Sequence, residues 1–231
     1  MLFNHMMKKM FLKHIKSVSL SCTARPVCLL TCAFLLFIVS PALASPDKDI
    51  KRIQDAYESI RDMKGSFIQE SSIKDLKRTD TYKGKFFIKQ PMKMKWSYDG
   101  KVNQEVFING DEIVIYQKNE KQAFRGTFDT DTYGRAPIAL LSGFGNIQEE
   151  FSISEKNGML LLKPKKKVSG IKSIELELGR DEFPIRSFTI YDSHENKIVI
   201  TLEDVKINTG LKDSMFKPSL PKDTTFFEPG L

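Results

Sequence analysis

Reactive side chains are scarce in this sequence of 231 residues. All three cysteines, Cys22, Cys28 and Cys32, lie near the amino terminus, and His194 is the one histidine that follows residue 44. Without cysteine or a pair of histidines, residues 45–231 have neither a disulfide framework nor the ligands of a zinc site. The composition therefore excludes disulfide-stapled and zinc-binding classes.

Groups arranged for catalysis are also missing. His194 lies in Asp192-Ser193-His194-Glu195-Asn196, a composition typical of a hairpin turn. Serine, histidine and acid neighbours in one tight turn do not converge on a substrate as the members of a triad do from separate elements. We therefore predict no enzyme activity, no metal site and no cofactor. A secreted hydrolase with His194 as its base is the alternative from another functional class.

Acidic residues are absent from the first 44 positions. Of the formal net charge of +7, this stretch supplies +5, which leaves +2 for the remainder. A nucleic-acid-binding protein needs a clustered basic face, and so small a net charge does not indicate one. We expect no nucleic-acid partner. The basic residues of this stretch are Lys8, Lys9, Lys13, Lys16 and Arg25.

The same stretch has the features of a signal peptide. Its basic region leads into an apolar run at 27–39, and Pro41 and the small-residue sequence Ala42-Leu43-Ala44 follow. The run has 13 residues, whereas a membrane-spanning helix needs about 20. We predict that residues 1–44 are removed by cleavage after Ala44 and that residues 45–231 form a single exported domain. An uncleaved anchor is the alternative.

The mature sequence opens with the pattern of one amphipathic helix. Ser45-Pro46 is typical of a helix start, with Ser45 as the N-cap. We predict that the helix ends near Met63-Lys64, with Gly65 in the left-handed C-cap conformation. Apolar residues at steps of three and four form one stripe on this otherwise charged helix: Ile50, Ile53, Tyr57 and Ile60.

After Gly65 the apolar period changes from helical spacing to alternation. Turn signals such as Asp99-Gly100, Asn109-Gly110 and Asn157-Gly158 separate the segments. About eleven strands without a helical crossover favour an antiparallel sheet. The predicted strands are 66–73, 81–90, 92–99, 103–109, 112–118, 121–127, 150–155, 159–163, 170–179, 185–193 and 196–204.

A second, apolar helix is predicted between the two sets of strands. It opens with Pro137 near its start and closes at Gly143. Two helices cannot cover both faces of so large a sheet. A curved, partly closed sheet with the helices across its mouth resolves this mismatch.

Alternation within residues 86–96 gives the sheet one apolar face, while lysines occupy positions 85, 89, 93 and 95 on the other. Methionine and aromatic side chains on one wall suit an adaptable binding surface, and they equally suit a solid core. The residues alone leave both interpretations open. The even positions, apolar except for one amide, are Phe86, Ile88, Gln90, Met92, Met94 and Trp96.

An ordered set of motifs makes residues 45–227 resemble the periplasmic outer-membrane lipoprotein carrier (LolA) family. The set begins with Gly65-Ser66-Phe67-Ile68-Gln69 and continues with residues 84–96 and 108–116. Leu162-Lys163-Pro164-Lys165 and Met215-Phe216-Lys217-Pro218 complete it in the expected order.

The resemblance implies both a fold and a function. The fold is mainly β with a few helices, an incomplete antiparallel β-barrel of about eleven strands with a helical lid over an apolar cavity. The function is that of a periplasmic carrier, here expected to be a monomer. It would shield the acyl chains of lipoproteins, take them from an inner-membrane ABC lipoprotein-release complex and pass them to an outer-membrane lipoprotein receptor. A lipid-binding or lipid-sensing periplasmic paralogue on the same fold is the alternative.

The resemblance also implies a set of ligand-binding residues. Met94 stands where the family often has Phe, and we expect it at the mouth of the cavity. The family commonly has Arg, implicated in closing the lid, where this chain has Gln90; we expect Gln90 to face the cavity and to donate to lid carbonyls. The full set is Phe86, Ile88, Gln90, Met92, Met94 and Trp96 on the sheet, Ile53 and Tyr57 on the first helix, and Ile138, Leu140 and Leu141 on the lid.

Overall fold

The structure is a computed structural model, and it describes residues 46–128, 147–166 and 170–227. The described elements all belong to one unit, Leu43–Leu231. The predicted signal peptide, the predicted N-cap Ser45 and the predicted lid helix at 135–143 lie outside the described residues.

Helix α1 (Pro46–Ser59) forms where the sequence predicts it. Asp47 and Asp49 lie in its first turn, where carboxylates interact favourably with the free N–H groups of a helix start. Ile50 and Ile53 are buried in the main apolar core, and Ile60, just beyond the helix, is buried with them. The predicted stripe therefore faces the sheet.

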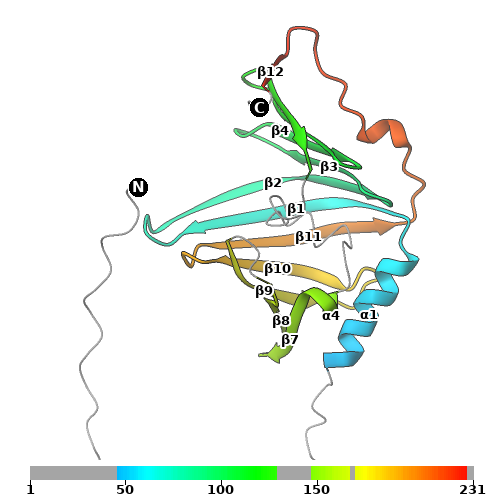
Figure 1. The fold of residues 1–231 in the computed structure, drawn as a ribbon, viewed down its shortest axis with the longest axis vertical. Coiled ribbons are helices and arrows are strands. Elements are labelled where there is room, and N and C mark those ends of the chain that lie inside the picture. Colours follow the sequence, from blue (N-terminus) through cyan, green and yellow to red (C-terminus); the bar gives the residue numbers. More distant parts are fainter. Residues whose placement is uncertain (1–45, 129–146, 167–169, 228–231) are drawn as a thin grey trace, which may run out of the picture. The chain divides into compact units, whose positions relative to one another are not determined.

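One open sheet of twelve strands makes up most of the domain (Figure 1). Its order is β12-β6-β5-β4-β3-β2-β1-β11-β10-β9-β8-β7, and the two ends are not joined into a closed barrel. The strands are β1 (Asp62–Ile73), β2 (Arg78–Lys89), β3 (Lys93–Tyr98), β4 (Gln104–Asn109), β5 (Glu112–Gln117), β6 (Gln122–Thr127), β7 (Phe151–Lys156), β8 (Met159–Pro164), β9 (Ile171–Leu178), β10 (Ile185–Asp192), β11 (Lys197–Ile207) and β12 (Thr225–Phe227).

All eleven predicted strands are confirmed, and their mutual pairings are antiparallel. Hairpin neighbours explain every pairing among them except the central one, in which β1 lies beside β11 and joins the two sets of strands. The sequence did not predict β12, which pairs in parallel with β6 through three residues. A short helix, α4 (Ile147–Glu150), precedes β7.

The predicted extension of α1 to Gly65 is wrong. The helix ends at Ser59, where the Asn208 side chain accepts a hydrogen bond from the Arg61 N–H at 2.8 Å and donates one to the Ser59 carbonyl at 3.4 Å. Gly65 instead lies within β1 at an irregularity in the register, and a Cβ there would come within 2.9 Å of the Phe86 ring. This glycine serves close packing inside the sheet.

The main core lies on the face of the sheet that receives α1, which we call the inner face. Cross-strand partners form continuous apolar rows there, because residues paired across antiparallel strands point to the same face. One row runs from Ile108 through Met94 and Ile88 to Met63 on four neighbouring strands. Another connects Ile200, Phe188, Leu176 and Leu160 on β11, β10, β9 and β8.

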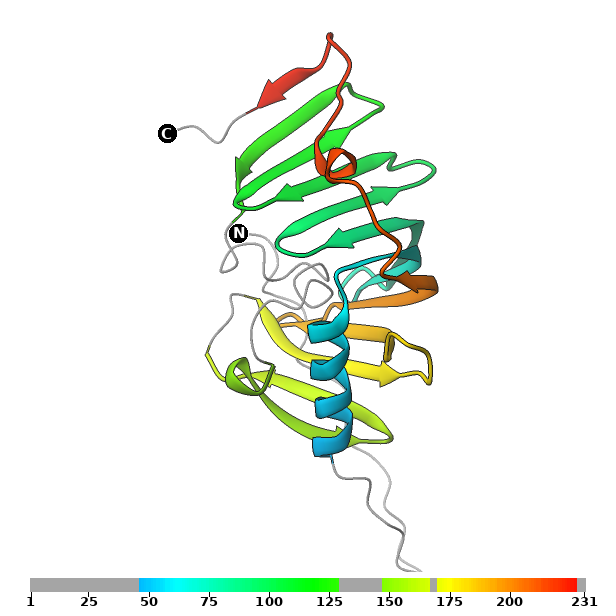
Figure 2. The same cartoon turned by 90° about the vertical axis from the view of Figure 1, so that its right-hand side faces the viewer.

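The opposite, outer face is covered over β3–β6 by the C-terminal segment, residues 208–227 (Figure 2). This segment contains the 3₁₀ helix η1 (Asp213–Phe216), which contacts β3 and β4. Leu220 packs on a second apolar cluster, and β12 then joins the edge of β6. The second cluster consists of Phe107, Val114, Tyr116 and Ala123.

Asp62 fixes the start of the C-terminal segment. Its buried carboxylate accepts hydrogen bonds from the backbone N–H groups of Thr209, Gly210 and Leu211 at 2.7, 3.0 and 3.3 Å, and from the Thr209 hydroxyl at 3.0 Å. Burial by itself would raise the pKa of Asp62, but these hydrogen bonds outweigh it and hold the pKa below its usual value. Asp62 is therefore a charged anchor that ties the first strand to the last segment.

Candidate functional site

Three stacked aromatic rings form the centre of the inner face. The Trp96 ring lies 4.2 Å from the Phe67 ring at 29°, and 5.6 Å from the Phe86 ring at 26°, measured between centroids. Glycines make room for this arrangement, since a Cβ on Gly84 would come within 2.8 Å of the Phe67 ring and one on Gly65 within 2.9 Å of the Phe86 ring. Two glycines thus let flat rings lie directly on the backbone of the neighbouring strand.

The alternation predicted for the inner face is confirmed for four residues. Phe86, Ile88, Met94 and Trp96 are buried in the main core. Met92 is half-buried against the same core, although it lies in the turn between β2 and β3. The predicted wall is therefore one contiguous apolar surface.

Helix α1 adds two of the predicted residues to this surface. Ile53 is buried in the core, and Tyr57 packs against it. The Tyr57 ring meets the Phe183 ring edge to face, with the centroids 5.8 Å apart. Burial raises the pKa of Tyr57 well above its usual value, so its hydroxyl stays protonated.

Met94 is not at a mouth that faces water. Only 1% of its surface is exposed, and its cross-strand partners on the inner face are Ile88 and Ile108. The predicted placement at an exposed mouth is therefore wrong, because β3 is an interior strand with apolar neighbours on both sides.

Gln90 does not point into the inner face. It is exposed in the turn that follows β2, and its amide Nε2 donates to the Tyr57 carbonyl of α1 at 2.9 Å. The inward orientation predicted from alternation is wrong, because strand alternation stops at Lys89 where β2 ends. The lid carbonyls that we expected as partners, near Ile138–Leu141, lie outside the described residues, as do the predicted lid residues Ile138, Leu140 and Leu141.

The inner face becomes polar at one end, a feature that the sequence analysis missed. The Tyr98 hydroxyl donates to Gln69 Oε1 at 3.0 Å, and Gln69 Nε2 donates to Ser71 Oγ at 3.0 Å. Tyr98 packs on the main core, and burial raises its pKa to about 12. The available signal was that Gln69 and Ser71 continue the inward alternation of Met63, Gly65 and Phe67 on β1. We call Gln69, Ser71, Tyr82 and Tyr98 the polar end of the inner face.

Comparison with known proteins places this arrangement in a family. The family described as outer membrane lipoprotein carrier protein LolA matches residues 58–219, which is more than half of the chain. This chain belongs to the LolA family. The match begins in the last turn of α1 and extends past η1.

Curated LolA-family relatives are similar over most of their length. An outer-membrane lipoprotein carrier protein of Halorhodospira halophila is 26% identical over 190 residues, covering 81% of this chain and 84% of the relative. One of Neisseria meningitidis serogroup B is 26% identical over 201 residues, covering 85% and 91%. Among solved structures, an uncharacterized conserved protein of Thermus thermophilus has a TM-score of 0.51 at 11% identity and covers 80% of this chain and 99% of that one. That likeness supports the fold.

His194 is the candidate base of the alternative hydrolase interpretation. His194 is exposed in the β10–β11 turn, where the Asp192 carboxylate accepts hydrogen bonds from the backbone N–H groups of His194 and Asn196, each at 2.8 Å. Asp192 therefore shapes the turn, as predicted from its sequence. The described residues contain no cluster of three or more His, Cys, Asp or Glu side chains that could hold a metal ion.

No helix among the described residues is both long and apolar enough to span a membrane.

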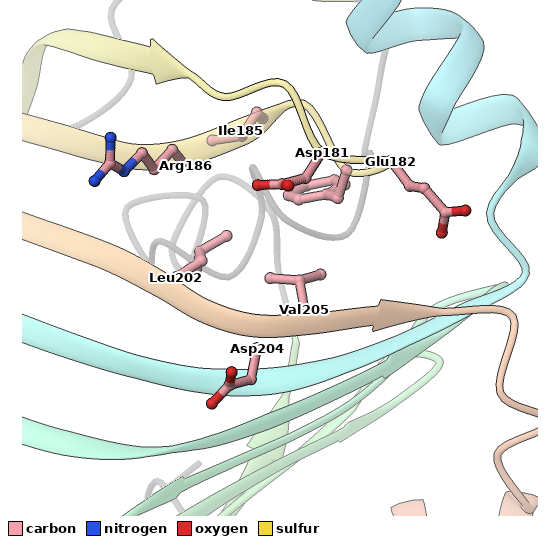
Figure 3. A pocket seen from close by; sticks show the side chains of 8 residues that line it. Asp181, Glu182, Ile185, Arg186, Leu202, Asp204 and Val205 are labelled. Carbon is pink, nitrogen blue, oxygen red and sulfur yellow. The ribbon is translucent and has the colours of Figure 1, made fainter.

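A separate pocket of about 330 Å³ lies beside the turn between β9 and β10 (Figure 3). Leu202 and Val205 point into it from β11, whereas Asp204 points to the other side of that strand. Its charged groups diverge, so they do not converge on a common substrate atom. The lining residues are Asp181, Glu182, Phe183, Ile185, Arg186, Leu202, Asp204 and Val205.

Proposed function

We propose that this protein is a periplasmic carrier that shields the acyl chains of lipoproteins. It takes them from an inner-membrane ABC lipoprotein-release complex and passes them to an outer-membrane lipoprotein receptor, as a monomer and without catalysis. The observation that carries the proposal is the contiguous apolar inner face in a LolA-family chain. The names of its curated relatives support the same role.

The physical need for such a carrier is large. Each buried CH₂ group of an acyl chain contributes about 0.8 kcal/mol to its retention in a membrane, so an acylated protein does not cross an aqueous compartment alone. The apolar inner face of the carrier would replace the lipid contacts that the acyl chain loses when it leaves the membrane. No covalent step is required of the carrier.

The proposed ligand-binding surface is built from both the sheet and α1. Because its side chains are buried in this structure, an acyl chain enters by displacing groups that now fill the face. Met92 and Met94 suit such repacking, since a flexible thioether side chain adapts to many shapes. The proposed contacts are Ile53, Tyr57, Phe86, Ile88, Met92, Met94 and Trp96, with Ile138, Leu140 and Leu141 from the predicted lid.

Trp96 offers a direct test, because it is the single tryptophan of the chain and lies at the centre of this surface. A synthetic diacylated lipopeptide with brominated acyl chains should quench its emission. The control combines Trp96→Phe with Phe107→Trp, which moves the tryptophan to the outer face. Quenching of the original protein alone supports the proposal. Equal quenching of both proteins, or of neither, contradicts it.

The identity of the cargo needs a second measurement. The protein is purified from a periplasmic extract, and the bound molecules are identified by mass spectrometry. Acylated protein is the expected finding. Phospholipid or another lipid without acylated protein would instead support the lipid-binding or lipid-sensing paralogue, for which the presence of Gln90 in place of the family's common Arg is the specific argument.

A further inference from the structure

The apolar inner face contains one buried donor without a partner. Trp96 is 1% exposed, and in the part of the chain that the structure describes its indole Nε1 makes no hydrogen bond of normal geometry, although the indole is close enough to the Tyr98 hydroxyl to lower the pKa of that group. A buried polar group left unpaired is destabilising, and such groups are uncommon in native proteins. The Trp96 ring lies 6.5 Å from the Tyr98 ring, so the free donor is next to the polar end.

The hydrogen bonds at the polar end all run in one direction. Tyr98 donates to Gln69, and Gln69 donates to Ser71, which leaves the hydrogen of the Ser71 hydroxyl to donate onward. Hydrogen bonds in such a chain polarise one another, so the last donor is strengthened. Two donors, Trp96 Nε1 and the Ser71 hydroxyl, are thus offered by a face that is otherwise apolar.

These two donors have no acceptor on the inner face among the described residues. The length of the inner face indicates which kind of ligand could bring one. From Gln69 to Met63, six residues along β1 span about 20 Å at roughly 3.3 Å per residue. An acyl chain spans about 15 Å in one leaflet of a bilayer core. A chain that starts at the polar end therefore fits along the apolar rows towards α1, and its carbonyl linkage stays at the donors.

We propose that the polar end binds the ester- or amide-linked part of an acylated cargo, with carbonyl oxygens accepting hydrogen bonds from Trp96 Nε1 and from the Ser71 hydroxyl. Tyr98 and Gln69 hold Ser71 in its donating arrangement. The inference rests on the proposed carrier function and gives the bound molecule a direction: carbonyl linkage at the polar end, methyl end towards α1. Tyr82, whose ring contacts the Tyr98 ring at 6.2 Å, borders this subsite.

The test compares two diacylated lipopeptides with identical chains, one ester-linked and one ether-linked. The ether analogue lacks the carbonyl acceptors but keeps the apolar length. Affinities are measured by displacement of a fluorescent fatty acid. The wild-type protein should bind the ester form at least about threefold to tenfold more tightly, the range expected for each hydrogen bond. Gln69→Leu and Ser71→Ala should each lower this ratio by weakening one donor, and Trp96→Phe should lower it by removing the other.

Tyr191→Phe is the matched control. The Tyr191 hydroxyl donates to Glu175 at 3.0 Å, so this variant also loses one tyrosine hydrogen bond, but on the outer face. Its ester preference should equal that of the wild type, whereas Tyr98→Phe should have a lower preference. Unchanged ether binding shows that a variant keeps an intact apolar face.

The outcomes separate the two levels of the proposal. Equal wild-type affinity for both analogues overturns the carbonyl subsite and leaves the carrier function standing. A preserved ester preference in Trp96→Phe, Gln69→Leu and Ser71→Ala also overturns it, because the preference then arises elsewhere. If the wild type binds neither lipopeptide, the carrier function itself is contradicted.

Discussion

The inner and outer faces of β2–β4 are held in different ways. On the inner face, stacked rings and aliphatic side chains make contacts that have little directional preference. On the outer face, lysines of the same strands form ion pairs: Lys89 and Lys93 with Asp213 at 2.7 and 2.6 Å, and Lys95 with Glu105 at 3.0 Å. The inner face can therefore repack around a bound acyl chain, while the ion pairs of the outer face keep the strands in register.

The strongest disruption of this division should come from Gly84→Ala. A Cβ at Gly84 would overlap the Ser97 carbonyl oxygen and lie 2.8 Å from the Phe67 ring, so both the backbone and the aromatic stack would have to move. We expect a loss of about 4 kcal/mol in the free energy of unfolding, measured by urea denaturation. Gly179→Ala is the control, because its nearest contact is 3.5 Å away. Equal stability of both variants would mean that the stack tolerates displacement.

Asp62→Asn should have the next largest effect. An amide at this position sets an NH₂ group against backbone donors, and we expect a loss of about 2 kcal/mol in the free energy of unfolding. Asp55→Asn, which removes an exposed ion pair with Lys51, should leave the free energy of unfolding almost unchanged.

The same carboxylate predicts a pH dependence. Because the folded protein holds the pKa of Asp62 below its usual value, its contribution is complete above the unfolded value of about 3.9 and is lost as the pH falls through the lower folded pKa. The acid-induced fall in stability should therefore be smaller in Asp62→Asn than in the wild type. Parallel profiles of the two proteins below pH 4 would contradict this.

Asp213→Asn should have a smaller effect that depends on salt. Hydrogen bonds and ion pairs with Lys89 and Lys93 lower the pKa of Asp213 to about 2, but the carboxylate is exposed and its interactions are screened. Amide exchange across residues 213–216 should become faster in the variant at low ionic strength, and the difference should shrink in high salt. A difference that persists in high salt would show that these bonds are not mainly electrostatic.

Gln90→Leu should have the smallest effect. It removes the exposed hydrogen bond to the Tyr57 carbonyl, worth about 0.5 kcal/mol. Amide exchange in the last turn of α1 should become slightly faster, while Gln90→Arg, which keeps a donor at this position, should preserve protection. Identical exchange in all three proteins would mean that Gln90 does not hold α1.

The eleven confirmed strands could be predicted from the sequence, because each one is marked locally by apolar–polar alternation between turn residues. Hairpin pairing of neighbouring strands then follows from their order in the chain. The sequence predicted the end of α1 wrongly, because a glycine that follows a helical pattern resembles a C-cap. Gly65 instead lies in a strand, where it makes room for the Phe86 ring. β12 has only three residues and pairs in parallel, so no local pattern announces it. The sequence did contain an indication that the outer face is covered. β5 is apolar on both faces, which is typical of a strand buried on both sides.

The candidate site was predicted in part, for related reasons. Phe86, Ile88, Met94 and Trp96 follow strict alternation inside strands, so their shared face could be predicted. Gln90 lies one residue beyond a strand, where alternation carries no information. The polar end depends on side chains from β1 and β3 meeting through Tyr98, and a contact between strands that are not hairpin neighbours has no signature in one sequence.

The central pairing of β1 with β11 has a consequence for biogenesis. Ser66 and Glu203, partners in this pairing, are 137 residues apart in the chain. Contacts so distant form late and slow folding, because a long loop must close before they stabilise anything. During synthesis, β1 lacks one of its two neighbours until almost the entire chain has been made. Such an order delays native structure, which would suit the export that the proposed periplasmic function requires.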